Sequence, residues 1–137
     1  MLIEVNDNLF INAKNISFVK LRKNYLGFTE LGYENLEQFE ISDKGEKELR
    51  DFFKFDKDFI EVSSSPYENQ YINIRAIGRA SIKEENEDED DEVILSIKFI
   101  NDTNFWTETL SKENALKIIN KIKEKILKSK SEYVDHF

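Results

Sequence analysis

Several residue types that carry protein chemistry are missing or scarce in this chain of 137 residues. It contains no cysteine, which excludes disulfides, thiolate metal sites and a cysteine nucleophile. Its single histidine, His136, is next to the last residue, so no internal imidazole is present for general base catalysis or a common zinc site. The four glycines never cluster, which excludes a phosphate-cradling loop. The sequence therefore predicts a protein that is not an enzyme and needs no cofactor; paired carboxylates, as in glycosidases or two-metal nucleases, are the enzymatic alternative.

Long apolar runs are also missing. No apolar segment approaches the roughly 20 residues that span a membrane. The first five residues, MLIEV, lack the basic region of a secretory signal. We therefore expect a cytoplasmic protein with no membrane partner. Eleven Phe and five Tyr supply enough apolar volume for a core, and the heavy use of Ile, Lys and Asn indicates an AT-rich genome, bacterial or phage.

Two stretches of the chain are similar in sequence. The segment LIEVNDNLFINAKNISFVKL begins at position 2, and FIEVSSSPYENQYINIRAIGRASI begins at position 59. Aligned residues lie 57 positions apart before the first turn, 61 after it, and 69 beyond the acidic run. Both changes of offset fall at turn-like stretches, so we interpret the chain as an internal repeat. Residues 1–57 form the first copy and residues 58–137 the second, with an acidic hairpin insertion at 84–92; chance similarity in a biased sequence is the alternative.

Each copy is expected to form short strands followed by one helix. Alternating and continuous apolar residues predict the strands, within 2–41 and within 59–110. Ser42 and Ser111 are the expected helix N-caps. The predicted fold class is α+β: two tandem antiparallel β-meander units, each closed by one helix and packed as one compact domain. Gly45 is expected to weaken the first helix by about 1 kcal/mol relative to Ala.

An aromatic cluster is expected where the two copies meet. It consists of Phe52, Phe53, Phe55 and Phe59. A partner-binding patch is the alternative interpretation of these side chains.

The second copy resembles a small bacterial module. In the segment YINIRAIGRASI…VILSIKFINDTNFWTETLSKENALKIINKIKEKI, an aromatic-Ile-Asn strand end leads to a strand, a hairpin, a further strand, Ser, and an amphipathic helix. Small flagellar-locus proteins of the FlbD type, and many phage and plasmid proteins, look like this. The resemblance covers residues 71–126 best, carries no catalytic motif, and implies a fold but no activity.

The acidic run is the most conspicuous feature of the composition. The stretch EENEDEDDE contains eight acidic residues, and neutralising them would bring the formal net charge from −8 to zero. These candidate partner-binding residues are Glu84, Glu85, Glu87, Asp88, Glu89, Asp90, Asp91 and Glu92. Such a run can attract a basic surface and raise the rate of association. A solvated, solubilising loop and a calcium site are the alternatives, although the run lacks the order of ligands in an EF-hand loop.

Two further features are candidates for binding. Trp106 is predicted to be an exposed partner contact, because its strand neighbours Phe105 and Leu110 can fill the core without it; burial of the tryptophan is the alternative. The last helix is rich in lysine. Positive charges near its C-terminal end are stabilised by the unpaired backbone carbonyls there, and the same lysines could contact phosphates. Its lysines are Lys117, Lys121, Lys123, Lys125, Lys128 and Lys130.

These observations favour a non-catalytic protein-binding module. An acidic inhibitor, immunity or anti-defence protein that acts on a basic, nucleic-acid-handling partner fits the size and charge. One alternative is a structural or regulatory adaptor that self-associates through sheet edges. Another is a nucleic-acid binder that uses the Lys-rich helix, which the overall acidity disfavours.

Overall fold

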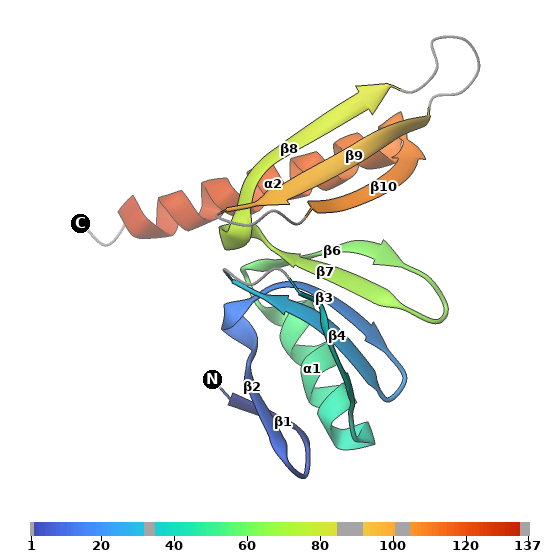
Figure 1. The fold of residues 1–137 in the computed structure, drawn as a ribbon. Coiled ribbons are helices and arrows are strands. Elements are labelled where there is room, and N and C mark those ends of the chain that lie inside the picture. Colours follow the sequence, from blue (N-terminus) through green and yellow to red (C-terminus); the bar gives the residue numbers. More distant parts are fainter. Residues whose placement is uncertain (1, 32–34, 85–91, 101–104, 135–137) are drawn as a thin grey trace. The chain divides into compact units, whose positions relative to one another are not determined.

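The structure is a computed structural model that describes residues 2–31, 35–84, 92–100 and 105–134 (Figure 1). Antiparallel sheets and two α-helices make up this part of the chain, which confirms the α+β class. Its elements in chain order are β1 (Leu2–Asn6), β2 (Leu9–Asn12), η1 (Ala13–Asn15), β3 (Ile16–Arg22), β4 (Tyr25–Glu30), β5 (Glu37–Glu40), α1 (Asp43–Phe55), β6 (Phe59–Ser64), β7 (Asn69–Asn73), η2 (Ile74–Ala76), β8 (Ile77–Glu84), β9 (Glu92–Phe99), β10 (Phe105–Ser111) and α2 (Lys112–Val134).

The chain divides into two compact units, Met1–Ala76 and Ile77–Phe137, where the sequence predicted one compact domain. The division follows η2, whereas the two copies of the sequence repeat meet between residues 57 and 58. The difference comes from the β6–β7 hairpin. By sequence this hairpin opens the second copy, but by strand pairing it belongs to the sheet of the first unit.

The sheet of the first unit has the order β5-β4-β3-β7-β6. Its middle strand, β3, pairs with β4 on one edge and with β7 on the other, where Val19 lies opposite Tyr71. Val19 and Leu21 are completely buried on one face of β3, and Phe18 is buried on the other. A strand that is apolar on both faces requires neighbours on both edges, because an uncovered edge would expose backbone groups and apolar side chains together. The hairpin of the second copy therefore completes the sheet of the first, instead of each copy forming a closed meander.

One face of this sheet is covered by α1 and by the separate two-stranded β1–β2 hairpin (Figure 1). Ser42 caps α1 as predicted, since its Oγ accepts a hydrogen bond from the backbone N–H of Gly45 at 3.0 Å. The first turn of α1 lies directly against β1. A Cβ atom added at Gly45 would come within 2.5 Å of the Val5 carbonyl oxygen. Gly45 is therefore required for this close approach, and the expected gain from Ala does not apply.

An aromatic cluster joins α1 to the β6–β7 hairpin. The Phe53 ring lies 4.9 Å from that of Phe59 and 5.4 Å from that of Tyr71, and Phe52 lies 5.8 Å from Phe59. These distances are typical of favourable aromatic pairs. The prediction that the copies meet through this cluster was wrong for Phe55, which is 75% exposed. Phe55 is the last residue of α1, two positions beyond Phe53, and so points away from the sheet.

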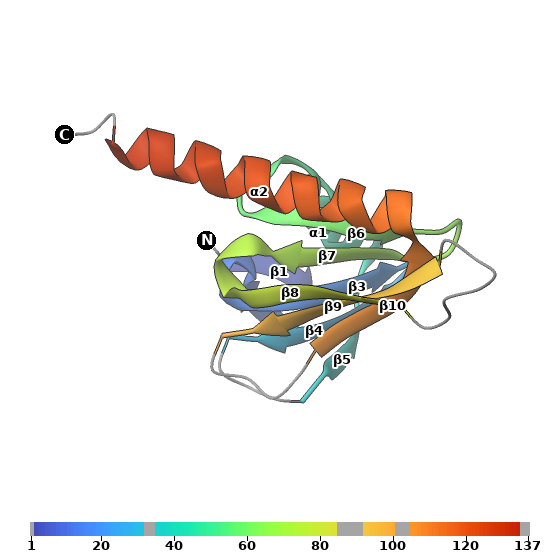
Figure 2. The same cartoon turned by 90° about the horizontal axis from the view of Figure 1, so that it is seen from above.

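The second unit has a three-stranded sheet of order β10-β9-β8, with α2 packed against β10 and β9. Figure 2 shows α2 running along the strands of its own unit. The buried residues of β9 all lie on one face, as their spacing predicts, and α2 contributes a buried apolar stripe. The residues of this core are Val93, Leu95, Ile97, Phe99, Ala115, Ile118 and Ile122.

Local geometry repeats between the two sequence copies. The β1–β2 register shifts between Glu4 and Asn6, and the β6–β7 register shifts at the two positions 57 residues later. The β3–β4 register shifts between Ile16 and Phe18, and the β8–β9 register shifts 61 residues later. The Oγ of Ser111 accepts from the Asn114 N–H, which repeats the α1 cap at an offset of 69. Corresponding residues of the two copies can therefore be compared position by position.

Candidate functional site

The acidic run lies at the closed end of the β8–β9 hairpin. Its first residue, Glu84, ends β8 and pairs with Val93, and its last residue, Glu92, begins β9. Both carboxylates are exposed. The other six candidates, within 85–91, lie outside the described residues. Glu84 Oε1 is 3.4 Å from Lys112 Nζ, and because both side chains are exposed this ion pair contributes little to stability.

Trp106 is buried, which overturns its prediction as an exposed partner contact. Its side chain is 6% exposed. In the β9–β10 pair it lies directly opposite Ile97, so the two side chains share a face of the sheet. That face carries the buried residues of β9 and forms the core of the second unit. The prediction counted apolar residues that could replace Trp106, but strand alternation decides which face a residue joins.

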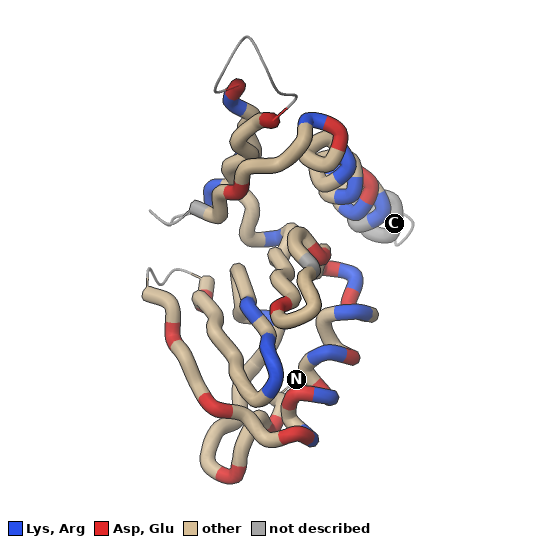
Figure 3. The backbone as a smooth tube through the Cα atoms, turned by 90° about the vertical axis from the view of Figure 1, so that its right-hand side faces the viewer, with Lys and Arg blue, Asp and Glu red and all other residues tan. Residues whose placement is uncertain are grey.

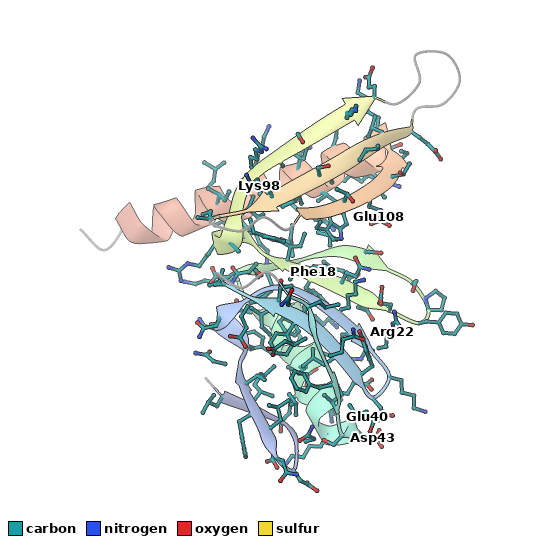
Figure 4. The ribbon with its side chains drawn as sticks, in the orientation of Figure 1. Phe18, Arg22, Glu40, Asp43, Lys98 and Glu108 are labelled. Atoms are coloured by element: carbon teal, nitrogen blue, oxygen red, sulfur yellow. The ribbon has the colours of Figure 1, made fainter. Side chains whose placement is uncertain are left out.

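Glu108 is a residue that the sequence prediction missed. Glu108 lies on β10 (Figure 4). It is opposite the buried Leu95 and two positions from Trp106, and therefore on the same apolar face. Its Oε2 atom is buried and makes no hydrogen bond with any residue that the structure describes. Burial raises the pKa of the Glu108 carboxyl above its ordinary value, because the charged form loses solvation. In the first copy the corresponding residue is Phe39, whose ring stacks on Phe28. The two-residue spacing of Trp106 and Glu108 places both on one face of the strand, and this signal could have predicted a carboxylate on the apolar face.

The Lys-rich helix presents its charges to solvent. The side chains of Lys117, Lys121, Lys123 and Lys128 are exposed. Figure 3 shows positive charges along α2 with negative charges among them, and the helix also carries the exposed Glu113 and Glu124. Lys125 is half-buried, and the side chain of Lys130 lies outside the described residues.

Three apolar side chains of α2 are exposed, and one of them, Ile126, continues the spacing of the buried stripe. They are Leu116, Ile126 and Leu127.

A polar network ties the β6–β7 hairpin to the end of β3. Arg22, at the end of β3 (Figure 4), donates from Nε to Glu68 Oε1 at 2.8 Å, and Gln70 Nε2 donates to Glu68 Oε2 at 2.6 Å. Burial alone would raise the pKa of the Glu68 carboxyl, but the hydrogen bonds from Gln70 and Arg22 outweigh it and lower that pKa. The guanidinium also lies over the Tyr25 ring at 4.9 Å. The Arg22–Glu68 pair therefore lies where the hairpin meets the end of β3, and because Arg22 is exposed, the register is set by the backbone pairing of β7 with β3.

Neither metal ligation nor membrane insertion has support in the described part of the chain. Within it, no group of three or more Asp, Glu, His or Cys side chains is placed to hold a metal ion. Likewise, neither α1 nor the described length of α2 is long and apolar enough to cross a membrane.

Comparison with known proteins gives no relatives. No protein-family model matches the chain, and no curated protein or solved structure is significantly similar to it.

Proposed function

We propose that this chain is a non-catalytic protein-binding module whose acidic hairpin end attracts a basic partner. The observation that carries the proposal is the position of the charge. Eight acidic residues account for the whole net charge of −8, and both ends of that run are exposed at the closed end of the β8–β9 hairpin. A paired ribbon of two eight-residue strands presents this charge at one end of the sheet.

Physical chemistry favours a fast encounter with a positively charged surface. Concentrated charge of one sign produces a field that raises association rates, and salt weakens it. A basic surface that normally binds nucleic-acid phosphates suits such a run, since carboxylates can occupy the same positive groove. The partner class proposed is therefore a basic, nucleic-acid-handling protein, and inhibition by occupation of its groove is the proposed action.

The test compares two variants of equal net charge. In the first, all eight acids of the run are replaced by Gln or Asn. In the second, eight acids elsewhere are replaced in the same way. All the control positions are exposed except Glu30, which is half-buried, and the ion pair of Glu113 with Lys117, at 3.5 Å, is exposed and contributes little to stability. The control positions are Glu4, Glu30, Glu37, Glu40, Glu48, Asp51, Glu113 and Glu124.

Each tagged protein is used to capture partners from the native host at low and at moderate salt. The proposal expects a basic protein to be retained by the wild type and by the control variant, less at moderate salt, and lost from the first variant. Equal capture by all three proteins would show that the run only adds solubility. Capture of nucleic acid that depends on Lys121 and Lys128 would favour the nucleic-acid binder instead.

A further inference from the structure

We propose that a second copy of this chain binds the free edge of β8, by adding its β1–β2 hairpin there as β6–β7 is added to β3. The inference does not depend on the function of the acidic run. It rests on the repeat, because β8 corresponds to β3 and β1–β2 corresponds to β6–β7. The pairing of β7 with β3 is therefore the template for the proposed pairing of β2 of one chain with β8 of another.

The edge of β8 lacks the neighbour that β3 has. Within the described part of the chain β8 pairs only with β9, and it is the outer strand of its sheet. Val19 and Leu21 of β3 are completely buried beneath their neighbours. The corresponding residues of β8 are Ala80, which is exposed, and Ile82, which is half-buried. An edge strand with uncovered apolar residues is a template for another strand.

The β1–β2 hairpin has the complementary property. Phe10 corresponds to Tyr71, and Leu2 corresponds to Phe59. Tyr71 and Phe59 are buried where the second hairpin meets β3 and α1. Phe10 is 54% exposed, compared with 6% for Tyr71, and Leu2 is likewise exposed. The first hairpin therefore displays to solvent the two side chains that the second hairpin buries on docking.

A polar contact is repeated in the same way. Asn73 Nδ2 donates to the Ile16 carbonyl at 3.0 Å and so fastens β7 to the start of β3. Asn12 occupies the corresponding place on β2, and Ile77 corresponds to Ile16. Asn12 is exposed, and its Oδ1 accepts from the Lys14 N–H as Asn73 Oδ1 accepts from the Arg75 N–H. In the proposed contact, Asn12 Nδ2 would donate to the Ile77 carbonyl of a second chain.

Charge complementarity supports the same register. The ion pair of Arg22 with Glu68, at 2.8 Å, joins the turn of the β6–β7 hairpin to the end of β3. Lys83 corresponds to Arg22 at the offset of 61, and Asp7 is the acidic residue of the β1–β2 turn as Glu68 is of the β6–β7 turn. Lys83 and Asp7 are both exposed. Docking of β1–β2 on β8 of another chain would place Asp7 of one chain near Lys83 of the other, at the end of β8 next to the acidic run.

The predicted contact is head to tail. By correspondence with Val19 and Tyr71, Ala80 of one chain lies opposite Phe10 of the next. The contact uses different surfaces on its two sides, so a bound pair still has one free hairpin and one free edge. Association should therefore continue to larger species as concentration rises, or stop at a closed ring.

A disulfide test reads the register directly, because the native chain has no cysteine. One chain carries Phe10→Cys and a differently tagged chain carries Ala80→Cys. Directly opposed residues of antiparallel strands have Cα atoms about 4.5–5.5 Å apart, which suits a disulfide. We expect a mixed disulfide-linked dimer in a glutathione redox buffer. The matched control pairs Ala80→Cys with Phe55→Cys, which is equally accessible but outside the hairpin, and should give much less product.

A second measurement needs no cross-link. Sedimentation of the wild-type chain should give an average mass above 16.2 kDa that rises with concentration. Asp7→Lys or Lys83→Glu should weaken association several-fold, and the double variant should restore it. The proposal is overturned if the wild type stays at the monomer mass up to about 1 mM, the Kd of a very weak complex. Equal cross-linking by the control pair, or association unaffected by both charge reversals, would also overturn it.

Discussion

Replacing Phe53 by Ala tests whether the aromatic cluster holds the β6–β7 hairpin onto the first unit. Phe53 is buried, and its ring packs against three others, those of Phe52, Phe59 and Tyr71, at 4.9–5.4 Å. Truncating a buried Phe to Ala typically costs about 3–5 kcal/mol, because transfer energy is lost and a cavity remains. Loss of the aromatic pairings adds to this cost. We therefore expect the free energy of unfolding to fall by about 4 kcal/mol.

The assay is urea unfolding followed by far-UV circular dichroism. A domain of this size is stabilised by only about 5–15 kcal/mol, and near the lower end of that range a loss of about 4 kcal/mol leaves too little folded Phe53→Ala protein for a complete curve. Phe53→Leu keeps part of the volume and should lose about 1–2 kcal/mol, which is measurable in every case. Phe55→Ala is the matched control, on the same helix but exposed, and should change stability by less than about 0.5 kcal/mol. Equal losses at Phe53 and Phe55 would refute the packing described.

Three other predictions concern single side chains. Glu108→Gln should raise the free energy of unfolding at pH 7 by up to about 1 kcal/mol, since it removes a charge that burial penalises. The raised pKa means that this cost is absent when the carboxyl is protonated, so thermal unfolding should show the gain shrinking as the pH falls to the ordinary value of 4.5. Gly45→Ala should lower stability by about 1–3 kcal/mol in urea unfolding, because the new Cβ meets the backbone of Val5 and not a movable side chain; a gain would show that the helix and β1 are further apart. Ser42→Ala and Ser111→Ala should each cost about 1 kcal/mol through loss of a helix cap, and Thr at either position should recover most of it.

Local features of the fold could be predicted from the sequence because their causes lie within a few residues. The offsets between the predicted copies change at two turn-like stretches, and the strand registers shift at corresponding positions of the two copies. Ser42 and Ser111 could be predicted as N-caps because each precedes an amphipathic segment, where a hydroxyl oxygen can accept a hydrogen bond from an unpaired N–H of the first helical turn. The structure confirms both caps.

The pairing of β7 with β3 could not be predicted in this way. It joins residues about 50 positions apart, such as Val19 and Tyr71, and sequence alternation does not specify which of several edges a strand will meet. The requirement for Gly45 was missed for the same reason, since the atom that forbids a side chain belongs to Val5. Both depend on contacts between elements that are distant in sequence.

For the candidate site, the sequence located the acidic run at a hairpin end, and Glu84 and Glu92 lie at the ends of β8 and β9. The prediction that Trp106 is exposed was wrong because it considered which neighbouring residues could fill the core. It did not consider which face of the strand Trp106 occupies. Parity alone would have placed Trp106 and Glu108 on one apolar face.

The most direct test of the account compares two shortened chains, residues 1–76 and residues 1–57. The central claim is that the hairpin of the second copy completes the sheet and core of the first. Far-UV circular dichroism and urea unfolding should show that the chain of residues 1–76 folds cooperatively. The chain of residues 1–57 should not, because the edge of β3 and the ring of Phe53 would be left uncovered. Equal cooperative stability of the two chains would contradict the claim.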